Sequence, residues 1–555
     1  MSSAEPDLVV FAKDDPEDAA NWSDGKKRLV AAQLILVMNS VFGSSFYAAT
    51  VLQLEATYGA SDVVISLGLS DYVLGTFERD VWATTTLPDC MASAPASAPS
   101  AYVNNLAVII LFRFFAGCCA ACALNNLYMT DMKAQAVAIA FYSAAVFAGP
   151  CVALPVGFFI AADAGPELWV LRTYLFFVAA LLPVVYILPE THGPTILAKR
   201  SARYRKLGNP NARAAHELNH LTTRQFCQVH IGRPFAMFIR EPIIQGAAVW
   251  TSLAYGIIYL FFEVYPFVFV QNFHFQLQFA GLPFISMVIG FITAILVNRP
   301  LAQLFIHMPF PSFLQPHDLH PNSPEARLKL ALLPCFLMPV SLLWFAWPRS
   351  SGGNVHWIVP TLSGVVFGFA AITIFFIFLT YAAETFTIYS NSSSVSNSFC
   401  RSVIAAIFPL ISNSLLNSLG VKWGVSLFAF LSLGLIPIPL IFLRYGTAFR
   451  KRSHYAQEAA ALVSRMQGGD ILMTERFPEI HERRELHSTT SLRTTASVSD
   501  EIDLSRGQSS VGIPIKSGGI GMDVPNELKR LDSSAELQKS SEFPCPPPDD
   551  SFPRV

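Results

Sequence analysis

The sequence predicts an all-α integral membrane protein with twelve membrane-spanning helices, arranged as two halves of six. The first observation is composition: of 555 residues, 52% are hydrophobic and only 14% are charged, with a mean hydropathy of +0.43. An average soluble protein has roughly 25% charged residues. The second observation is the recurrence of long apolar stretches, and the third is a basic stretch that divides them into two groups. Apolar surface of this extent requires a lipid bilayer as its solvent.

The apolar stretches define the candidate spans. A helix needs about 20 mostly apolar residues to cross the hydrocarbon core of a bilayer. Eleven stretches meet or approach this length: residues 29–49, 62–77, 105–129, 134–162, 168–188, 243–270, 279–298, 328–347, 355–383, 399–419 and 423–443. The second of them is short, and the others are long enough to cross.

The basic residues predict which loops are cytoplasmic, because Lys and Arg in short loops mark that side of a membrane. Lys26, Lys27 and Arg28 precede the first span, and the loop 190–241 carries nine Lys or Arg against three acids. A further basic group follows the last span: Arg444, Arg450, Lys451 and Arg452. Both termini and the central loop are therefore predicted to be cytoplasmic.

Parity of the crossings predicts a hidden third span. Two segments on the same side of a membrane are joined by an even number of crossings, yet only five candidate spans precede the loop 190–241, whereas six follow it. We therefore expect a degenerate third helix at about 81–102. It overlaps the polar interval GTFERDVWATTTLPDC (Gly75–Cys90) and contains Pro95 and Pro99, which lower its hydropathy and its helix propensity.

The resulting organisation has five parts. They are a cytoplasmic N-terminal segment (1–28), a first half (29–189), a basic cytoplasmic loop (190–241), a second half (242–446) and a cytoplasmic tail (447–555). The tail is rich in Ser, Thr and Pro and is expected to be mostly disordered, with a short surface helix at Tyr455–Met466. Two six-helix halves joined by a basic loop are a common plan of secondary transporters, in which the substrate site lies near the midplane between the halves.

Local sequence narrows this plan to a family. Six stretches carry the resemblance: DPEDAANW (Asp15–Trp22), LPETHGPTILAKRSARYRK (Leu188–Lys206), YGIIYLFFEVYPFVF (Tyr255–Phe269), PEARLKLALLPCFLMPVSLLWFAW (Pro324–Trp347), HWIVPTLSGVVFGFA (His356–Ala370) and SNSFCRSVIAAIFPL (Ser396–Leu410). Together they resemble the fungal drug:proton antiporters of the major facilitator superfamily, and among these the polyamine, cycloheximide and fluconazole resistance exporters. The resemblance covers roughly residues 15–446 and implies the major facilitator fold.

The departures from the family lie in the first half. The family's G-x-L-A-D-R-x-G-R-R gating loop after span two is replaced by TFERDVWATTTLPDCMASAPASAPSA, and the basic loop after span four is reduced to Asp131–Lys133. The antiporter pattern of span five survives only in part, at Gly149–Gly157. Three explanations for the lost loop stay open: a misread exon boundary, a diverged transporter or a decayed gene.

Charged residues at membrane depth are the first candidates for function, because each costs about 2.5–3.5 kcal/mol on insertion scales. Arg113 lies eight residues inside span four, where the resemblance implies a role in proton transfer; the alternative is an Arg that snorkels or holds backbone carbonyls. Glu263 lies twenty residues into span seven and is a candidate for binding a proton or a cationic amine. Its alternative is a solvated carboxylate near the outer surface.

The remaining proton-coupling candidates are Glu384 and Asp131, each of which is equally read as a charge at the end of a span. Arg401 is expected to anchor the start of span eleven at the cytoplasmic interface. The resemblance further implies a substrate cavity lined from spans one, four, seven and ten, with the candidates Asn39, Tyr47, Asn125, Asn126, Tyr259, Phe262 and Tyr381. Aromatic walls suit flat hydrophobic drugs and attract amines by cation–π interaction.

The expected function is proton-driven export of a drug-like, toxic or secondary metabolite across a fungal membrane, the plasma membrane before the vacuolar one. The chain contains no Gly-rich phosphate loop, so we expect the proton gradient as energy source and no cofactor. The expected partners are a small-molecule substrate and the lipid bilayer, with no nucleic acid and no second copy of the chain.

The sequence does not predict an enzyme or a metal site, but it leaves two alternatives to an exporter open. No nucleophile–base constellation predicts an enzyme, and Cys118, Cys119 and Cys122 lie in an apolar run without the His or acidic companions of a metal site. Two alternatives stay open: an importer of a small organic solute, and a non-transporting sensor or vestigial transporter. The broken gating loop and the long tail favour the second alternative.

Overall fold

The computed structural model describes residues 7–11, 15–18, 21–23, 25–27, 29–30, 42–82, 87–120, 132–163, 168–187, 189, 193–218, 224–225, 228–307, 323–348 and 355–467. These residues are mostly helical, which confirms the predicted helical class. The exception is one small sheet of two strands.

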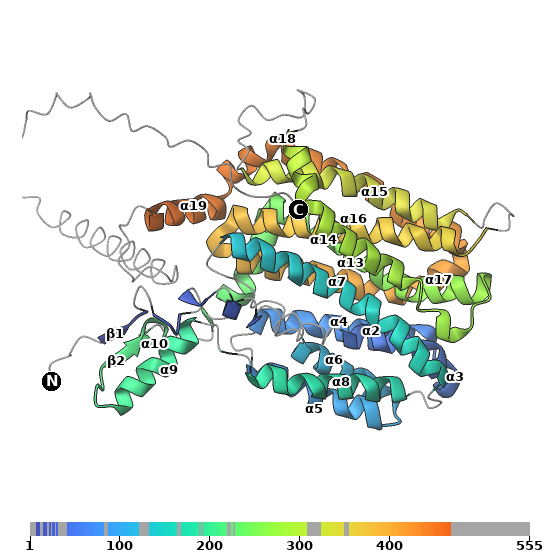
Figure 1. The fold of residues 1–555 in the computed structure, drawn as a ribbon, viewed down its shortest axis with the longest axis horizontal. Coiled ribbons are helices and arrows are strands. Elements are labelled where there is room, and N and C mark those ends of the chain that lie inside the picture. Colours follow the sequence, from blue (N-terminus) through green and yellow to red (C-terminus); the bar gives the residue numbers. More distant parts are fainter. Residues whose placement is uncertain are drawn as a thin grey trace, which may run out of the picture. The chain divides into compact units, whose positions relative to one another are not determined.

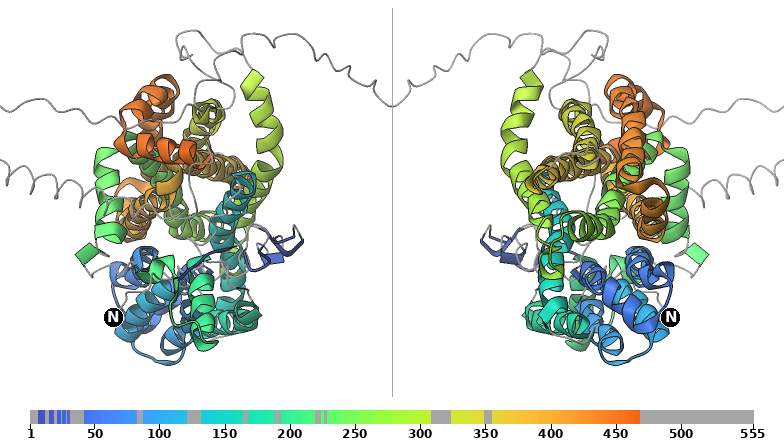
Figure 2. Two further views of the ribbon diagram at one scale, coloured as in Figure 1. Left: turned by 90° about the vertical axis from the view of Figure 1, so that its left-hand side faces the viewer. Right: turned by 90° about the vertical axis from the view of Figure 1, so that its right-hand side faces the viewer.

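The first half consists of antiparallel helices on one side of the bundle (Figure 1). They are α2 (Phe42–Ala48), α3 (Val51–Tyr58), α4 (Asp62–Trp82), α5 (Leu87–Tyr102), α6 (Leu106–Ala120), α7 (Met132–Asp163) and α8 (Leu168–Ile187). The helix α4 packs on α6, and α5 packs on both α6 and α8. The helix α7 lies where this group meets the second half (Figure 2).

The second half contains the longer helices. They are α13 (Pro242–Pro266) with its continuation η5 (Phe267–Asn272), η6 (Leu277–Phe279), α14 (Phe284–His307), η7 (Pro324–Arg327), α15 (Leu328–Ala346), α16 (Ile358–Phe386), η8 (Thr387–Tyr389), α17 (Ser390–Leu435) and α18 (Pro437–Arg452). A last helix, α19 (His454–Gln467), follows and corresponds to the short helix predicted at 455–466. The helical chain thus continues past 446, where the tail was predicted to begin.

The apolar helices have the length that a membrane requires. Among the described residues, five apolar helical stretches are long enough to cross a bilayer: Val146–Asp163, Pro242–Asn272, Leu277–Phe305, Pro324–Ala346 and Ile358–Arg452, of which the last contains α16, α17 and α18. Shorter apolar helices lie at Leu106–Cys119 and Trp169–Val184. The helix α16 alone has 29 residues, or about 43 Å at 1.5 Å per residue. The prediction of an integral membrane protein is therefore supported by the length and composition of these helices.

A helix occupies the interval that hydropathy left ambiguous. The helix α5 has 16 residues, or about 24 Å, and includes both Pro95 and Pro99. Its last turn is held by the helix α8, because Arg172 Nε donates to the carbonyl oxygen of Ala101 at 3.2 Å and the guanidinium stacks over the Tyr102 ring at 5.2 Å. Packing against α6 and α8 thus stabilises a helix that its own sequence disfavours.

The chain reverses within α17 at Gly420. This residue has φ 68° and ψ 172°, a conformation that is open essentially only to glycine. The rings of Phe408 and Phe428, on either side of the reversal, lie with centroids 4.9 Å apart. The turn falls between the spans predicted at 399–419 and 423–443, so that α17 comprises two antiparallel helices.

We expect Gly420→Ala to lower the free energy of unfolding by about 1–3 kcal/mol, because only the backbone conformation resists a side chain there. A Cβ at Gly420 meets nothing within 4 Å, so no steric clash contributes. Gly434→Ala is the matched control: its Cβ also meets nothing within 4 Å, but its backbone is helical. We expect the control to be neutral or stabilising by up to about 1 kcal/mol. Thermal unfolding of the purified protein measures both, and equal effects would contradict the assignment.

The N-terminal segment folds onto the central loop. Strand β1 (Asp7–Val9) pairs in parallel with strand β2 (Ala212–Ala214), in the register Asp7 with Ala212 and Val9 with Ala214. These strands and the helices α9 (Gly193–Lys206) and α10 (Ala215–Leu218) form a small unit, whose apolar core consists of Val9, Leu197, Ala212 and Ala214 with Phe11 packed against it. The segment 1–28 and the loop 190–241 were predicted separately, and the structure joins them.

Ion pairs stabilise the contact between the N-terminal segment and the central loop. Arg200 on α9 donates to Asp15 through Nη1 at 2.5 Å and Nη2 at 2.9 Å, and to Glu17 through Nη2 at 2.6 Å. Bidentate contacts of this kind are the strong form of an arginine–carboxylate pair. We call the end of the bundle that carries this unit and the last turn of α18 the basic end, and the opposite end, with α3 and Gly420, the far end.

The small unit also has a pH-sensitive ion pair. Glu217 accepts hydrogen bonds from Arg205, Ser201 Oγ and the Ala214 amide at 2.8–3.0 Å, and the Arg205 contact is the main reason that the pKa of this carboxyl falls to about 2. A carboxyl whose pKa is lowered by folding stabilises the fold fully above its ordinary pKa of 4.5 and loses that contribution as the pH falls through about 2.

We therefore expect hydrogen exchange in residues 193–218, corrected for its intrinsic pH dependence, to accelerate as the pH falls from 4.5 towards 2. Glu217→Gln removes the charge and should give the fast exchange already at pH 7. Exchange in α13 serves as the internal control, since it lies outside the unit. Unchanged exchange in the Gln variant would contradict the stabilising role of the Arg205–Glu217 pair.

Candidate functional site

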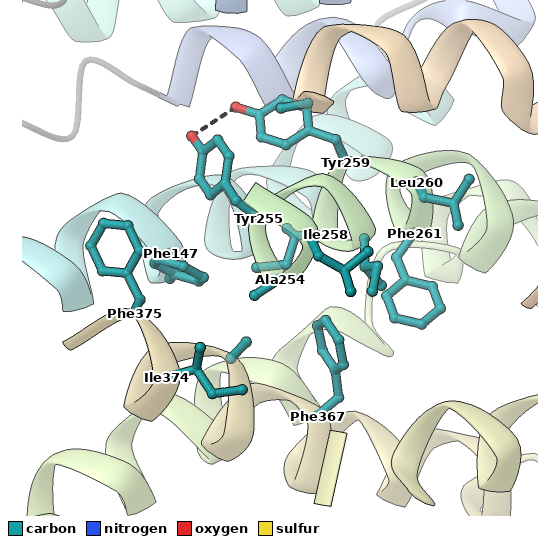
Figure 3. Packing of buried hydrophobic residues seen from close by; sticks show 14 of the residues in the cluster. Phe147, Ala254, Tyr255, Ile258, Tyr259, Leu260, Phe261, Phe367, Ile374 and Phe375 are labelled. Carbon is teal, nitrogen blue, oxygen red and sulfur yellow. Dashed lines mark hydrogen bonds between the residues drawn. The ribbon is translucent and has the colours of Figure 1, made fainter. Parts of the chain in front are cut away.

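The helix α13 is the centre of the molecule. It is mostly apolar, and most of its side chains are buried, as expected of a helix surrounded by others. The first half contacts it through Phe147 of α7, whose ring lies edge-on to Tyr255 at 5.6 Å and to Phe375 of α16 at 5.0 Å. Figure 3 shows these three rings together in the buried core. This aromatic contact marks the boundary between the two halves.

A line of polar groups runs along one face of α13. Tyr255, Tyr259 and Glu263 follow one another at intervals of four residues, which places them on one face of the helix. The hydroxyls of Tyr255 and Tyr259 are 3.2 Å apart (Figure 3), and the Tyr259 hydroxyl is 3.1 Å from Ser44 Oγ on α2. We call these residues the polar line: Tyr255, Tyr259 and Glu263 with Ser44 and Ser66.

Glu263 is held from both halves. Ser66 Oγ on α4 donates to Glu263 Oε1 at 3.0 Å, and Ser412 Oγ on α17 donates to Glu263 Oε2. Another hydrogen bond between the halves lies on the same two helices, α4 and α17, where Ser70 Oγ donates to the carbonyl oxygen of Ala406 at 2.7 Å. A partly buried carboxylate is thus the point where helices of the first and second halves share one hydrogen-bonding group.

Arg113 is tied to the backbone of the first half. Its side chain is 2% exposed; Nε donates to the carbonyl oxygen of Gly68 at 2.6 Å and Nη2 to that of Gly43 at 2.9 Å. Its guanidinium lies over the Tyr47 ring at 4.3 Å and the Tyr72 ring at 5.1 Å. Among the described side chains Arg113 forms no ion pair. The arginine therefore joins α6 to α2 and α4.

The glycines beside Arg113 are required by close approach. A Cβ at Gly43 would lie 2.5 Å from the Tyr174 ring, and one at Gly68 would lie 2.5 Å from the Tyr47 ring. Because Gly43 immediately precedes Ser44, the carbonyl that holds Arg113 is adjacent to the serine that meets Tyr259. Arg113 and the polar line are thus connected through two adjacent residues of α2, Gly43 and Ser44.

We expect Arg113→Lys to lower the free energy of unfolding by about 2–3 kcal/mol, even though it keeps the charge. An ammonium cannot occupy both carbonyls in the fork geometry of a guanidinium or stack on two rings. Arg172→Lys is the matched control, because Arg172 donates only one hydrogen bond to the backbone from a partly buried position, and we expect it to lose less than about 1 kcal/mol. The measurement is thermal unfolding; equal losses would contradict the role of the two carbonyls.

The structure brings some of the predicted site residues together. Tyr47 lies under Arg113 and donates to the carbonyl oxygen of Ile65 at 2.8 Å. Phe262 lies beside Tyr259, with ring centroids 4.8 Å apart, next to Glu263 on the same helix. The predicted residues Asn39, Asn125, Asn126 and Asp131 lie outside the described residues.

Two predicted residues lie at the basic end instead. Glu384 forms an ion pair of 2.8 Å with Arg327, where α16 ends. Tyr381, one turn earlier, is fully buried and packs on Phe442 of α18, with ring centroids 6.2 Å apart. A neighbouring acid that hydropathy did not single out, Glu325, is fully buried and lies 3.3 Å from Arg450. These charges hold α16, α18 and η7 together, away from the polar line.

Arg401 lies further inside its helix than the sequence predicted. It was expected at the membrane interface, but it is 5% exposed and lies well inside α17. The reason is that α17 begins at Ser390, because the polar run 390–398 is helical and largely buried rather than a loop. The Arg401 guanidinium lies over the Tyr255 ring at 5.1 Å and the Phe375 ring at 5.3 Å. In the sequence, the burial of Arg401 is indicated only by the small Ser and Asn residues that precede it, because small side chains fit into a packed helix.

The fold and site together define an integral membrane protein of two helical halves that meet along a mixed aromatic and polar boundary, an architecture of secondary transporters. Comparison with known families gives a match of residues 90–409 to the Major Facilitator Superfamily. The chain belongs to this superfamily, as its six motif stretches predicted. The match begins inside the interval predicted to hold the degenerate third span.

Several fungal transporters are similar over most of their length. The efflux pump FUB11 of Gibberella moniliformis is 30% identical over 502 residues, which cover 85% of this chain and 81% of that protein. The multidrug transporter TPO1_2 of Candida glabrata is 32% identical over 474 residues, covering 81% and 80%. The multidrug transporter mdrA of Aspergillus fumigatus is 29% identical over 533 residues, covering 91% and 84%.

Proposed function

We propose that this chain exports a small drug-like, toxic or secondary metabolite from the fungal cytoplasm, driven by the proton gradient. The names of its relatives support export, because they are efflux pumps and multidrug transporters. The single structural observation that supports proton coupling is Glu263, whose carboxylate accepts hydrogen bonds from Ser66 of the first half and Ser412 of the second.

The proposed coupling follows from the hydrogen-bonding capacity of a carboxyl group. An ionised carboxylate only accepts hydrogen bonds, so it suits two serine donors at once. A protonated carboxyl carries an O–H that donates, and it then accepts less strongly. Proton binding at Glu263 would therefore weaken the hydrogen bond that it accepts from Ser66 and favour separation of the halves. Ser412 belongs to the same half as Glu263 and would stay in contact in either state.

We assign to Arg113 the supporting role of holding α2 and α4 in place around Glu263. It fixes the carbonyl of Gly43, and the next residue, Ser44, bonds Tyr259 one helical turn from Glu263. A movement of α2 that follows protonation of Glu263 would therefore change the hydrogen bond between Gly43 and Arg113. No cofactor enters this scheme, and a monomer in the plasma membrane suffices for it.

We further propose twelve crossings with both termini cytoplasmic. The pairing of β1 with β2 supports this topology, because residues 7–9 and 212–214 must lie on the same side of the membrane to form a sheet. An even number of crossings then separates them. Five candidate spans were recognised by hydropathy in this stretch, and α5 supplies a helix for the sixth. Basic residues at that end favour the cytoplasm.

The export proposal is tested by accumulation in yeast that lack their own drug exporters. Cells that express the chain should retain less radiolabelled benzoate or less rhodamine 6G than cells with the empty vector, and a proton-gradient uncoupler should abolish the difference. Export that persists with the uncoupler would refute proton coupling. Greater accumulation than in the control would make the chain an importer, and equal accumulation of a panel of such compounds would favour the non-transporting alternative.

We expect Glu263→Gln to reduce export about tenfold or more and to remove its dependence on external pH, because the amide keeps hydrogen-bonding contacts with both serines but cannot titrate. Glu384→Gln is the matched control, since this acid is paired with Arg327 at the basic end, and it should change export less than about threefold. Transport rates at pH 5 to 8 measure both. Normal, pH-dependent export by the Glu263 variant would overturn its assignment as the proton site.

A further inference from the structure

Arg401 places a permanent positive charge inside the second half. A guanidinium stays protonated in proteins, and this one is nearly inaccessible to solvent. Tyr255 of α13 and Phe375 of α16 lie against it, while Nη2 donates to Ser398 Oγ, one turn earlier on its own helix, at 3.3 Å. The charge therefore lies among three helices of the second half.

The surroundings of Arg401 are part of the boundary between the halves. Both of its aromatic neighbours, Tyr255 and Phe375, are covered by one side chain of the first half, Phe147 (Figure 3). Tyr255 is also linked through Tyr259 to Ser44 of the first half. Any separation of the halves that opens a path to substrate must remove Phe147 from these rings, and it then uncovers the group that contains Arg401.

The geometry differs from that of Arg113, which is buried in the first half. Arg113 directs its donors to two backbone carbonyls, which hold it in place as a structural element. Arg401 donates from Nη2 to a serine hydroxyl on its own helix, and its ring contacts come from α13 and α16. Aromatic rings occupy the faces of a guanidinium, whereas its N–H groups lie in its plane. Two parallel in-plane donors match the two oxygens of a carboxylate.

We propose that Arg401 selects the substrate, by binding the carboxylate of a flat aromatic acid whose ring lies among Tyr255, Phe375 and Phe147. This inference rests on the proposed export function and names its substrate class. The rings supply apolar area and stacking for the body of the acid. A cationic amine is disfavoured at this position by repulsion from the guanidinium.

The test is equilibrium binding to the purified full-length protein, measured in detergent without a proton gradient. Three probes of one shape are compared: 2-naphthoate, 2-naphthamide and 2-naphthylmethylamine. We expect the acid to bind the wild type about tenfold or more tightly than the amide. Arg401→Gln should remove this preference and leave amide affinity unchanged, whereas Arg401→Lys should retain part of it. Arg327→Gln, at the basic end, is the control and should preserve the preference.

Each contrary outcome overturns the proposal in a different way. Equal affinity of the wild type for acid and amide, tighter binding of the amine, or no binding of the acid excludes carboxylate recognition. An equal loss of acid and amide binding in Arg401→Gln makes the arginine a structural residue. If that variant does not fold, the acid-to-amide ratio of the wild type and of Arg401→Lys decides. Because no gradient is needed, the result is independent of whether export is coupled to protons.

Discussion

The constraint on which the structure depends is that a bilayer offers no hydrogen-bonding partner to the backbone or to a polar side chain. The backbone responds by forming helices, and hydroxyls in the spans commonly bond a carbonyl on their own helix, as Ser363, Thr380 and Thr385 do. A hydroxyl that reaches another helix is therefore informative. Ser44 and Ser66 do so across the boundary between the halves, and they meet α13 on the one face that carries an acid.

Glycines allow neighbouring helices to approach closely within each half. Within the first half, a Cβ at Gly117 would lie 2.1 Å from the carbonyl oxygen of Tyr72; within the second, one at Gly290 would lie 2.2 Å from that of Val365. These glycines let α4 and α6, and likewise α14 and α16, touch backbone to backbone. The halves meet through side-chain hydroxyls and aromatic rings. They also touch backbone to backbone at one place, where a Cβ at Gly281 would lie 2.7 Å from Pro155 Cα of α7.

Much of this was predictable from the sequence, and the failures have physical causes. Apolar length predicted the helices, and the depth of Arg113 within its span predicted burial, whereas the sequence left open whether Glu263 is buried or solvated. Hydropathy could not place Arg401, because a Ser- and Asn-rich stretch resembles a loop, although its small side chains fit a packed helix. Nor could it connect Asp15 with Arg200, since a contact between residues 185 positions apart leaves no local pattern. In α5, tertiary packing overcame two prolines.

The junction of the N-terminal segment with the central loop also has a consequence for biogenesis. The strand β1 is synthesised before its partner β2, which follows 205 residues later, and Asp15 is synthesised 185 residues before Arg200. At about 5–20 residues per second, the segment waits roughly 10 to 40 s for its partner. In the proposed topology, β1 can pair with β2 only after an even number of helices between them has crossed the membrane. A missing helix between them would leave β1 and β2 on opposite faces of the bilayer, where they could not form the observed sheet.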